Sequence, residues 1–261
     1  MSASPAASAL APDGAGIDRL APTRRPAGRP VMYQRWRHLT FLHWSLPPEV
    51  MAPLLPPGLT LDTFEGRAWV GLVPFTMQGV RPRGLPAVSF LSDFHETNVR
   101  TYVHHRGGHP GVWFFSLEAA NALAVRLARS WFKLPYHHAE MTLSAEPGGT
   151  GFAYHSRRRW PPPTPGTCAV RATPRGPVLP SVPGTLQHFL VERYFLYSRA
   201  HDVLYRGQVH HPPYQVRSAD VEGLDESLLA AAGIPRPAEA PLAHFSEGVD
   251  VDVFRLERVG P

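Results

Sequence analysis

Residues 94–117 decide the fold, and they read FHETNVRTYVHHRGGHPGVWFFSL. Polar side chains alternate with β-branched ones along the first half, which is the two-residue period of a strand. The Arg106-Gly107-Gly108 turn separates this run from a second apolar run at 111–117. Two such runs around a glycine turn predict a β-hairpin.

Strand-like runs continue on both sides of this hairpin. The chain has 30 prolines in 261 residues, and proline breaks the interiors of helices and sheets, so the elements should be short. A strand and a short helix are predicted between Tyr33 and the turn at Gly58. Further strands are predicted at 59–64, 68–77, 87–91, 139–145, 151–158, 169–173, 203–209 and 249–258. The economical arrangement is a meander that closes into a curved antiparallel β-barrel or cone, an α+β fold that is mainly β.

A few helices should flank this sheet. Residues 118–131 are rich in Ala and Leu, with an apolar stripe of Leu123, Leu127 and Trp131 at helical spacing. Two more helices are predicted at 185–198 and 225–232.

The N-terminal 30 residues differ from the rest of the chain. They consist mostly of Ala, Pro, Gly and Ser, with too few large apolar side chains to offset the entropy of ordering them. Residues 1–30 are therefore predicted to be a disordered leader, and residues 31–261 a single domain.

Composition restricts the compartment and the partners. The single cysteine, Cys168, excludes an intramolecular disulfide. No window approaches 18 consecutive apolar residues, and the N-terminus lacks the basic-then-apolar order of a secretory signal. We expect a cytoplasmic protein that does not bind membranes, and a homo-oligomer is compatible with the sequence.

The positive charge is spread along the chain. The net charge is +5, yet only Arg157, Arg158 and Arg159 form a run, which is more typical of a solvated turn than of a phosphate groove. Nucleic acid is therefore the least favoured partner, and we expect a small-molecule ligand instead.

One face of the predicted strand at 96–103 is a polar ladder. Its period places Glu96, Asn98, Arg100 and Tyr102 together. A carboxyl group, an amide, a guanidinium and a phenol in register could orient a small carboxylate or carbonyl compound. A solvent-facing surface is the equally weighted alternative.

In the predicted helix at 185–198, Arg193 falls within the apolar stripe that should face the core. A buried arginine needs a partner, so Arg193 should form an ion pair with Glu96 or Glu192, or else bind a substrate carboxylate. Its neighbour Tyr194 is included as a candidate substrate-binding residue.

Histidines occur in adjacent pairs, but neighbours on a strand point to opposite faces, so a pair cannot chelate a metal ion alone. We expect no metal and no cofactor. His137 shares its face with Ala139 and Met141, which makes it the member of its pair directed toward a cavity or into the core.

Lys133 is the only lysine in the chain. It ends the helix predicted at 118–131, where its ammonium group should interact with the last helical carbonyls. The alternative is a desolvated amine that forms a Schiff base.

Four stretches of this sequence resemble the YqjF-like family of uncharacterised bacterial proteins. They are HWSLPPEVMAPLLPPGL, FHETNVRTYV followed by GVWFFSLEA, LPYHHAEM, and FLVERYFLYS followed by VHHPPY, and the resemblance spans residues 33–216. This family is similar to the acetoacetate-decarboxylase-like superfamily. The resemblance implies a curved antiparallel barrel or cone around an interior pocket.

The same resemblance bears on the chemistry. The decarboxylases use a lysine after the central helix and a glutamate from an earlier strand. Glu96 resembles that glutamate, whereas the segment Leu134-Pro135-Tyr136-His137 places Tyr136 or His137 at the lysine position. The resemblance therefore implies the pocket without the nucleophile.

These observations predict a pocket for a small oxo or carboxylate metabolite, in a lyase or hydrolase that works without a Schiff base. Glu96 would be the acid or base, Tyr136 and His137 would polarise the ligand or carry protons, and Arg100 or Arg193 would hold a carboxylate beside Asn98. The alternative is a non-catalytic carrier or sensor of the same ligand.

Overall fold

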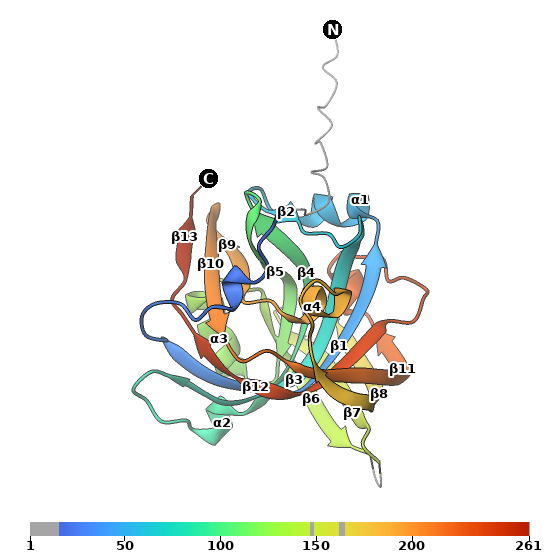
Figure 1. The fold of residues 1–261 in the computed structure, drawn as a ribbon. Helices are drawn as coiled ribbons and strands as arrows, with labels where there is room; N and C mark the ends of the chain where they lie inside the picture. The colour runs from blue at the N-terminus through green and yellow to red at the C-terminus, as the bar shows by residue number, and fades with distance from the viewer. Residues whose placement is uncertain (1–15, 147–148, 162–164, 261) are drawn as a thin grey trace.

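The computed structural model describes residues 16–146, 149–161 and 165–260. Within them a single sheet of 13 strands forms the molecule (Figure 1). The strands are β1 Met32–Leu46, β2 Thr60–Leu61, β3 Ala68–Pro82, β4 Phe94–His105, β5 Gly108–Ala119, β6 Tyr136–Ala145, β7 Phe152–Trp160, β8 Thr167–Pro180, β9 Phe195–Ala200, β10 Val203–His210, β11 Gln215–Glu226, β12 Leu242–Val253 and β13 Glu257–Val259. The predicted β-rich fold with few helices is confirmed.

The sheet is strongly curved and closes on itself, but it is not a regular barrel. Pairing of β4 with β5 closes a ring through β6, β7, β8, β11, β12, β1 and β3. Pairing of β10 with β12 closes a second ring, in which β9 and β10 replace β6, β7, β8 and β11. The sheet is not purely antiparallel, because β5 pairs in parallel with both β6 and β9. The two rings share β12, β1, β3, β4 and β5.

The shared strands have a hydrophobic core on each face. On β3, Val73, Phe75 and Met77 belong to one core, whereas Val70 and Leu72 belong to the other. This division follows from the alternation of side chains along a strand. We call the first the cavity core (principally Leu39, Phe41, Val73, Phe75, Tyr102, Val112, Phe189, Val209, Val251) and the other the second core (principally Leu42, Trp44, Val70, Leu72, Val99, Tyr154, Val170, Leu228).

The helices are shorter than the sequence predicts. They are α1 Pro48–Met51, α2 Ser89–Ser92, α3 Ala122–Trp131, α4 Leu186–Val191 and α5 Leu228–Ala231, with 3-10 turns at Ala21–Thr23 and Ala52–Leu54. None of the helices in the described residues is long and apolar enough to cross a membrane.

Helix α3 begins later than predicted. Residues 118–119 belong to β5, and the Asn121 side chain caps the helix by accepting hydrogen bonds from two backbone amides. Leu123, Leu127 and Trp131 are 48%, 46% and 59% exposed, so this apolar stripe does not face the core. The buried side of α3 is formed around Val125 instead.

The helix predicted at 185–198 is also wrong beyond Val191. The helix ends at Val191, and residues 195–200 form strand β9, which pairs with β10. The strand predicted at 87–91 is wrong as well, because residues 89–92 form α2, where the Ser92 hydroxyl accepts a hydrogen bond from the Val88 amide. Strand β11 was missed, and the helix predicted at 225–232 is reduced to α5.

The predicted leader lies partly outside the described residues, which begin at 16. The described part packs on the sheet: Pro22 is buried and its carbonyl accepts a hydrogen bond from Gln208 at 3.1 Å. Arg19 forms an ion pair with the buried Asp62, and its guanidinium lies over the Phe189 ring. Residues 16–30 therefore differ from the predicted disorder.

Candidate functional site

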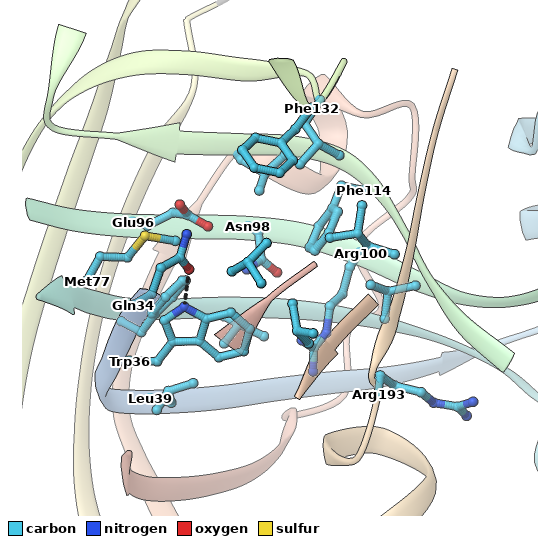
Figure 2. Close-up of a pocket in the computed structure, with 18 of the residues that line it drawn as sticks. Gln34, Trp36, Leu39, Met77, Glu96, Asn98, Arg100, Phe114, Phe132 and Arg193 are labelled. Carbon is cyan, nitrogen blue, oxygen red and sulfur yellow. Dashed lines mark hydrogen bonds between the residues drawn. The ribbon is translucent and has the colours of Figure 1, made fainter. Parts of the chain in front are cut away.

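A small interior cavity lies on the cavity-core side of the shared strands. It encloses about 100 Å³, and most of its wall is apolar (Figure 2). Strands β1, β3, β4 and β5 supply most of this wall, with principal apolar contributions from Trp36, Leu39, Val73, Phe75, Val112 and Phe114. An enclosure of this size can hold a few non-hydrogen atoms away from bulk water.

The polar ladder of β4 faces this interior rather than solvent. Figure 2 shows Glu96, Asn98 and Arg100 side by side along one strand, directed toward the space bounded by Trp36 and Phe114. Glu96 and Asn98 are 2% and 4% exposed. The alternation recognised in the sequence therefore places three of its four polar residues on the cavity wall.

Tyr102, the fourth residue of the ladder, is used internally. Its hydroxyl donates to the Leu190 carbonyl at 2.8 Å and lies 2.7 Å from Nε2 of His43. Burial lowers the pKa of His43 well below its usual value, and Arg100 and His244 add to this effect. Tyr102 therefore connects β4 to the end of α4 and does not line the cavity.

Glu96 and Tyr136 form the central polar pair of the cavity. The Tyr136 hydroxyl donates to Oε2 of Glu96 at 2.9 Å, and both side chains are buried. Burial raises the pKa of Glu96 to about 8, although Tyr136 and Asn98 oppose this rise. Glu96 is therefore mainly a neutral carboxylic acid at pH 7, and it retains one O–H group to donate.

Asn98 and Arg100 carry unused hydrogen-bonding groups. Within the described residues, Oδ1 of Asn98 and Nε of Arg100 are buried and have no partner. One terminal nitrogen of Arg100 donates to the Leu190 carbonyl at 3.1 Å, and the guanidinium lies over the Phe41 and Tyr102 rings. In the described part of the chain Arg100 forms no ion pair, so its positive charge is not balanced by a carboxylate.

Arg193 lies at the edge of the cavity but already has an anionic partner. It pairs with Asp62 at 2.9 Å, and its Nε donates to the Phe189 carbonyl. Figure 2 shows its guanidinium directed away from the cavity. The structural ion pair expected for Arg193 is present, but its partner is neither Glu96 nor Glu192.

Tyr194 does not reach the cavity. Its hydroxyl donates to Glu192 at 2.7 Å, and its ring stacks on His211. Glu192 also accepts from Ser181 and from the Tyr214 amide, so this carboxylate organises the turn after α4. Tyr194 was predicted to bind substrate, but it is not among the residues that line the cavity.

His137 lies on the opposite face of β6 from Tyr136 and does not line the cavity. Burial lowers its pKa to about 4, and Arg158 and Arg129 add to this effect. Its register partner on β5 is Glu118, whose carboxylate forms a bidentate ion pair with Arg158 at 2.6 and 3.0 Å. Of these two adjacent residues, Tyr136 therefore lines the cavity and His137 does not.

The amine of Lys133 is also outside the cavity. Its Nζ donates to the Ser130 carbonyl near the end of α3, as expected for a lysine directly after the C-terminus of a helix. The described residues contain no group of three His, Cys, Asp or Glu side chains that could hold a metal ion.

Three residues of this region were not predicted from the sequence. Trp36 and Gln34 line the cavity from β1, where the Trp36 indole donates to Gln34 at 2.8 Å. Asp62 was treated as an ordinary residue of a strand. A charged residue within the apolar run LTLDTF was the available signal, because aspartate is depleted in strands.

Comparison with known proteins identifies the family of this chain. Residues 33–250 match the family model DUF2071, which is described as an uncharacterised conserved protein. The chain is 35% identical to the uncharacterised protein YqjF of Bacillus subtilis over 233 residues, which cover 89% of this chain and 94% of that protein.

Solved structures of similar fold come from another group of proteins. The enduracididine biosynthesis enzyme MppR, complexed with pyruvate, aligns with a TM-score of 0.58 at 12% identity over 90% of this chain and 92% of its own. Acetoacetate decarboxylase from Legionella pneumophila aligns with a TM-score of 0.58 at 12% identity over 98% of each chain. At these identities the likeness concerns the fold alone. The chain thus belongs to the uncharacterised DUF2071 family and has the fold of acetoacetate-decarboxylase-like proteins.

Proposed function

We propose that the cavity binds a small oxo acid or a related carboxylate, with the carboxylate toward Arg100 and the carbonyl group toward Glu96 and Asn98. The observation that carries this proposal is the charge distribution on β4. Arg100 has no carboxylate partner in the described residues, while Glu96 is neutral at pH 7 and does not repel an anion. A small anion would therefore balance the positive charge of Arg100 on this wall.

The spacing on β4 supports this orientation. Side chains two residues apart on one face are separated by roughly 7 Å, so Asn98 lies between the other two groups. Because all three side chains reach the cavity, a small oxo acid could contact the long Arg100 side chain at one end and the Asn98 amide or the Glu96 carboxyl group at the other. That pyruvate is bound by MppR, a structural neighbour, is consistent with a ligand of this size.

The chemistry that this arrangement supports is a proton transfer to or from the bound ligand, in a lyase or hydrolase step. A neutral Glu96 can donate its proton to a carbonyl oxygen, and the Tyr136 hydroxyl holds the carboxyl group in place. Schiff-base chemistry is not proposed, because Lys133 lies outside the cavity.

A non-catalytic carrier or sensor is the second candidate. It is favoured by the absence of any Ser, Thr, Cys, Lys or His among the residues described as lining the cavity. Product analysis after long incubation with a bound acid separates the two: a carrier returns the ligand unchanged, whereas an enzyme converts it.

A thermal-shift screen tests the proposal. Oxo acids, hydroxy acids, aldehydes and uncharged amides of the same size are compared, because a ligand at about 100 times its Kd stabilises the folded protein by about 2.7 kcal/mol. We expect carboxylates to raise the Tm and amides to have little effect.

Two cavity variants and one control identify the site. Arg100→Gln should abolish the carboxylate shift, Glu96→Gln should weaken it, and Arg83→Gln, at an exposed position, should leave it unchanged. Each shift is measured relative to the variant's own unliganded Tm. If Arg100→Gln and Glu96→Gln both retain the full shift, the cavity is not the binding site.

A further inference from the structure

Strand β5 has a gap in its pairing. On the edge opposite β4, residues 111–113 pair with β9 and residues 117–119 pair with β6. Among the described residues, Phe114, Phe115 and Ser116 therefore have no strand partner on that edge. On this edge of β5, side chains rather than a hydrogen-bonded strand fill the space between β9 and β6.

The interior cavity and a surface groove meet at this gap. The groove, of about 440 Å³, runs along the outside between α3 and β9, and Phe114 and Leu134 line both spaces. The side chains of Phe114 and Leu134 separate the two spaces, and on the edge of β5 opposite β4 no strand pairs with residues 114–116, so a change of rotamer at these two side chains would connect the cavity to the groove without breaking strand pairing.

The groove is lined by cations. Arg129, Lys133 and Arg199 contribute to it, and none of the described residues that line it is acidic. Arg199 is paired with the exposed Asp202, which reduces its charge, whereas in the described residues Lys133 contacts only a helix carbonyl. The groove therefore carries net positive charge at the point where it reaches the cavity.

A second surface cleft approaches the cavity from β1, through Gln34. Its charged residues are Arg35, Arg81, Asp250 and Asp252, together with two histidines, so its charges are close to balanced. Of these two approaches, as lined by the described residues, the groove at the gap in β5 is the one whose charge attracts an anion.

We propose that small anions enter the cavity through the gap in β5, between Phe114 and Leu134, and that the cationic groove containing Lys133 and Arg199 selects and steers them. This inference rests on the proposed function, since it supplies the entrance for the carboxylate that Arg100 would hold. It also assigns a role to Lys133 that involves no covalent chemistry.

The test uses a cysteine placed inside the cavity, so it does not depend on knowing the ligand. Val112→Cys puts a thiol on the cavity wall. Its thiolate displaces iodide from either iodoacetate, a small carboxylate, or iodoacetamide, its neutral counterpart of similar size. The wild-type chain should not react, because Cys168 is buried and burial raises the pKa of its thiol.

The charge of the groove is tested first. The ratio of the iodoacetate rate to the iodoacetamide rate, divided by the same ratio for a free thiol, should exceed one at low salt and fall as salt is added. Adding Lys133→Glu and Arg199→Glu should lower the ratio by at least about threefold. Arg83→Glu, which reverses one exposed charge in the loop between β3 and α2, should leave it unchanged. If the ratio is unchanged by Lys133→Glu and Arg199→Glu, the groove does not steer anions and this part of the proposal is wrong.

The position of the entrance is tested second. Phe114→Ala, or the milder Phe114→Leu, should accelerate both reagents alike, whereas Trp36→Ala, which thins the wall on the β1 side, should not. Acceleration by Trp36→Ala alone would place the entrance at the cleft by Gln34 and overturn the proposal. Because alkylation needs no ligand, these outcomes are independent of whether any acid binds in the thermal-shift screen.

Discussion

The two faces of β4 contact different interiors. One face carries Glu96, Asn98 and Arg100 along the cavity, where a carboxylic acid is neutral and a guanidinium has no anionic partner in the described residues. The other face carries Thr97 and Val99 toward the second core. Nearby on β5, the buried Glu118 is matched by Arg158. Glu118 on the second face is therefore paired, whereas Arg100 on the cavity face has no carboxylate partner among the described residues.

The largest effect should come from breaking the paired charge. Glu118→Gln leaves Arg158, whose side chain is 6% exposed, without its anion. Loss of one partner of a buried pair costs about 3–5 kcal/mol of the free energy of unfolding. Urea denaturation at pH 7 measures this change, with exposed Glu140→Gln, which removes an ion pair with Arg159, as the control that should cost under about 1 kcal/mol.

The same substitution at Glu96 should have the opposite sign. A folded pKa of about 8 against an ordinary value of 4.5 means that Glu96 binds a proton on folding between these pH values. The folded protein therefore loses stability as the pH rises from about 4.5 to about 8, by up to about 1.4 kcal/mol per pH unit. Glu96→Gln removes this loss and should stabilise the protein by about 1–3 kcal/mol at pH 7.

The pH dependence provides the check on Glu96. The difference in unfolding free energy between Glu96→Gln and the wild type should be near zero at pH 4.5 and should grow up to about pH 8. A difference that stays constant over this range means that Glu96 is ionised in the folded protein, and the contrast between the two glutamates would then disappear.

Apolar truncation distinguishes the two cores with one matched pair. Val70 and Val73 lie three residues apart on β3 and are 0% and 1% exposed. Val70 faces the second core, and Val73 faces the cavity core. Val70→Ala should cost about 2 kcal/mol, and Val73→Ala about 1 kcal/mol, because Val73 already borders a cavity. Equal costs in thermal unfolding would show that the cavity does not relax the packing around it.

The smallest effect is expected at Lys133. Lys133→Met removes one hydrogen bond to a helix carbonyl and should change stability by less than about 0.5 kcal/mol. Borohydride treatment of the wild-type protein with an oxo acid should add no mass at Lys133, as measured by mass spectrometry. A reduced adduct at Lys133 would show that this amine forms a Schiff base with the oxo acid, which contradicts the prediction.

The sequence was most informative where one strand dictates geometry. The two-residue period of β4 was enough to group Glu96, Asn98 and Arg100, because alternation on a strand does not depend on distant contacts. Placing Tyr136 beside Glu96 came from a family resemblance. No local pattern could have found this pair, because 40 residues separate the two positions.

Sequence reasoning was less successful where tertiary contacts override local preference. The run FLVERYFLYS favours a helix by composition, yet the helix ends at Val191, and Glu192 accepts hydrogen bonds from Ser181, Tyr194 and Tyr214. The partner of Arg193 could not be foreseen either, because Asp62 is 131 positions away. The exposed stripe of α3 shows that helical periodicity alone does not say which face is covered.

The double burial of β4 has a consequence for substitutions on its cavity face. A shift of one residue in the pairing of β4 would exchange its two faces and place Thr97 and Val99 in the cavity. Tight packing of the odd-numbered side chains opposes such a slip, so it holds the even-numbered side chains in position. A substitution at position 96, 98 or 100 should therefore change the cavity wall without moving the strand.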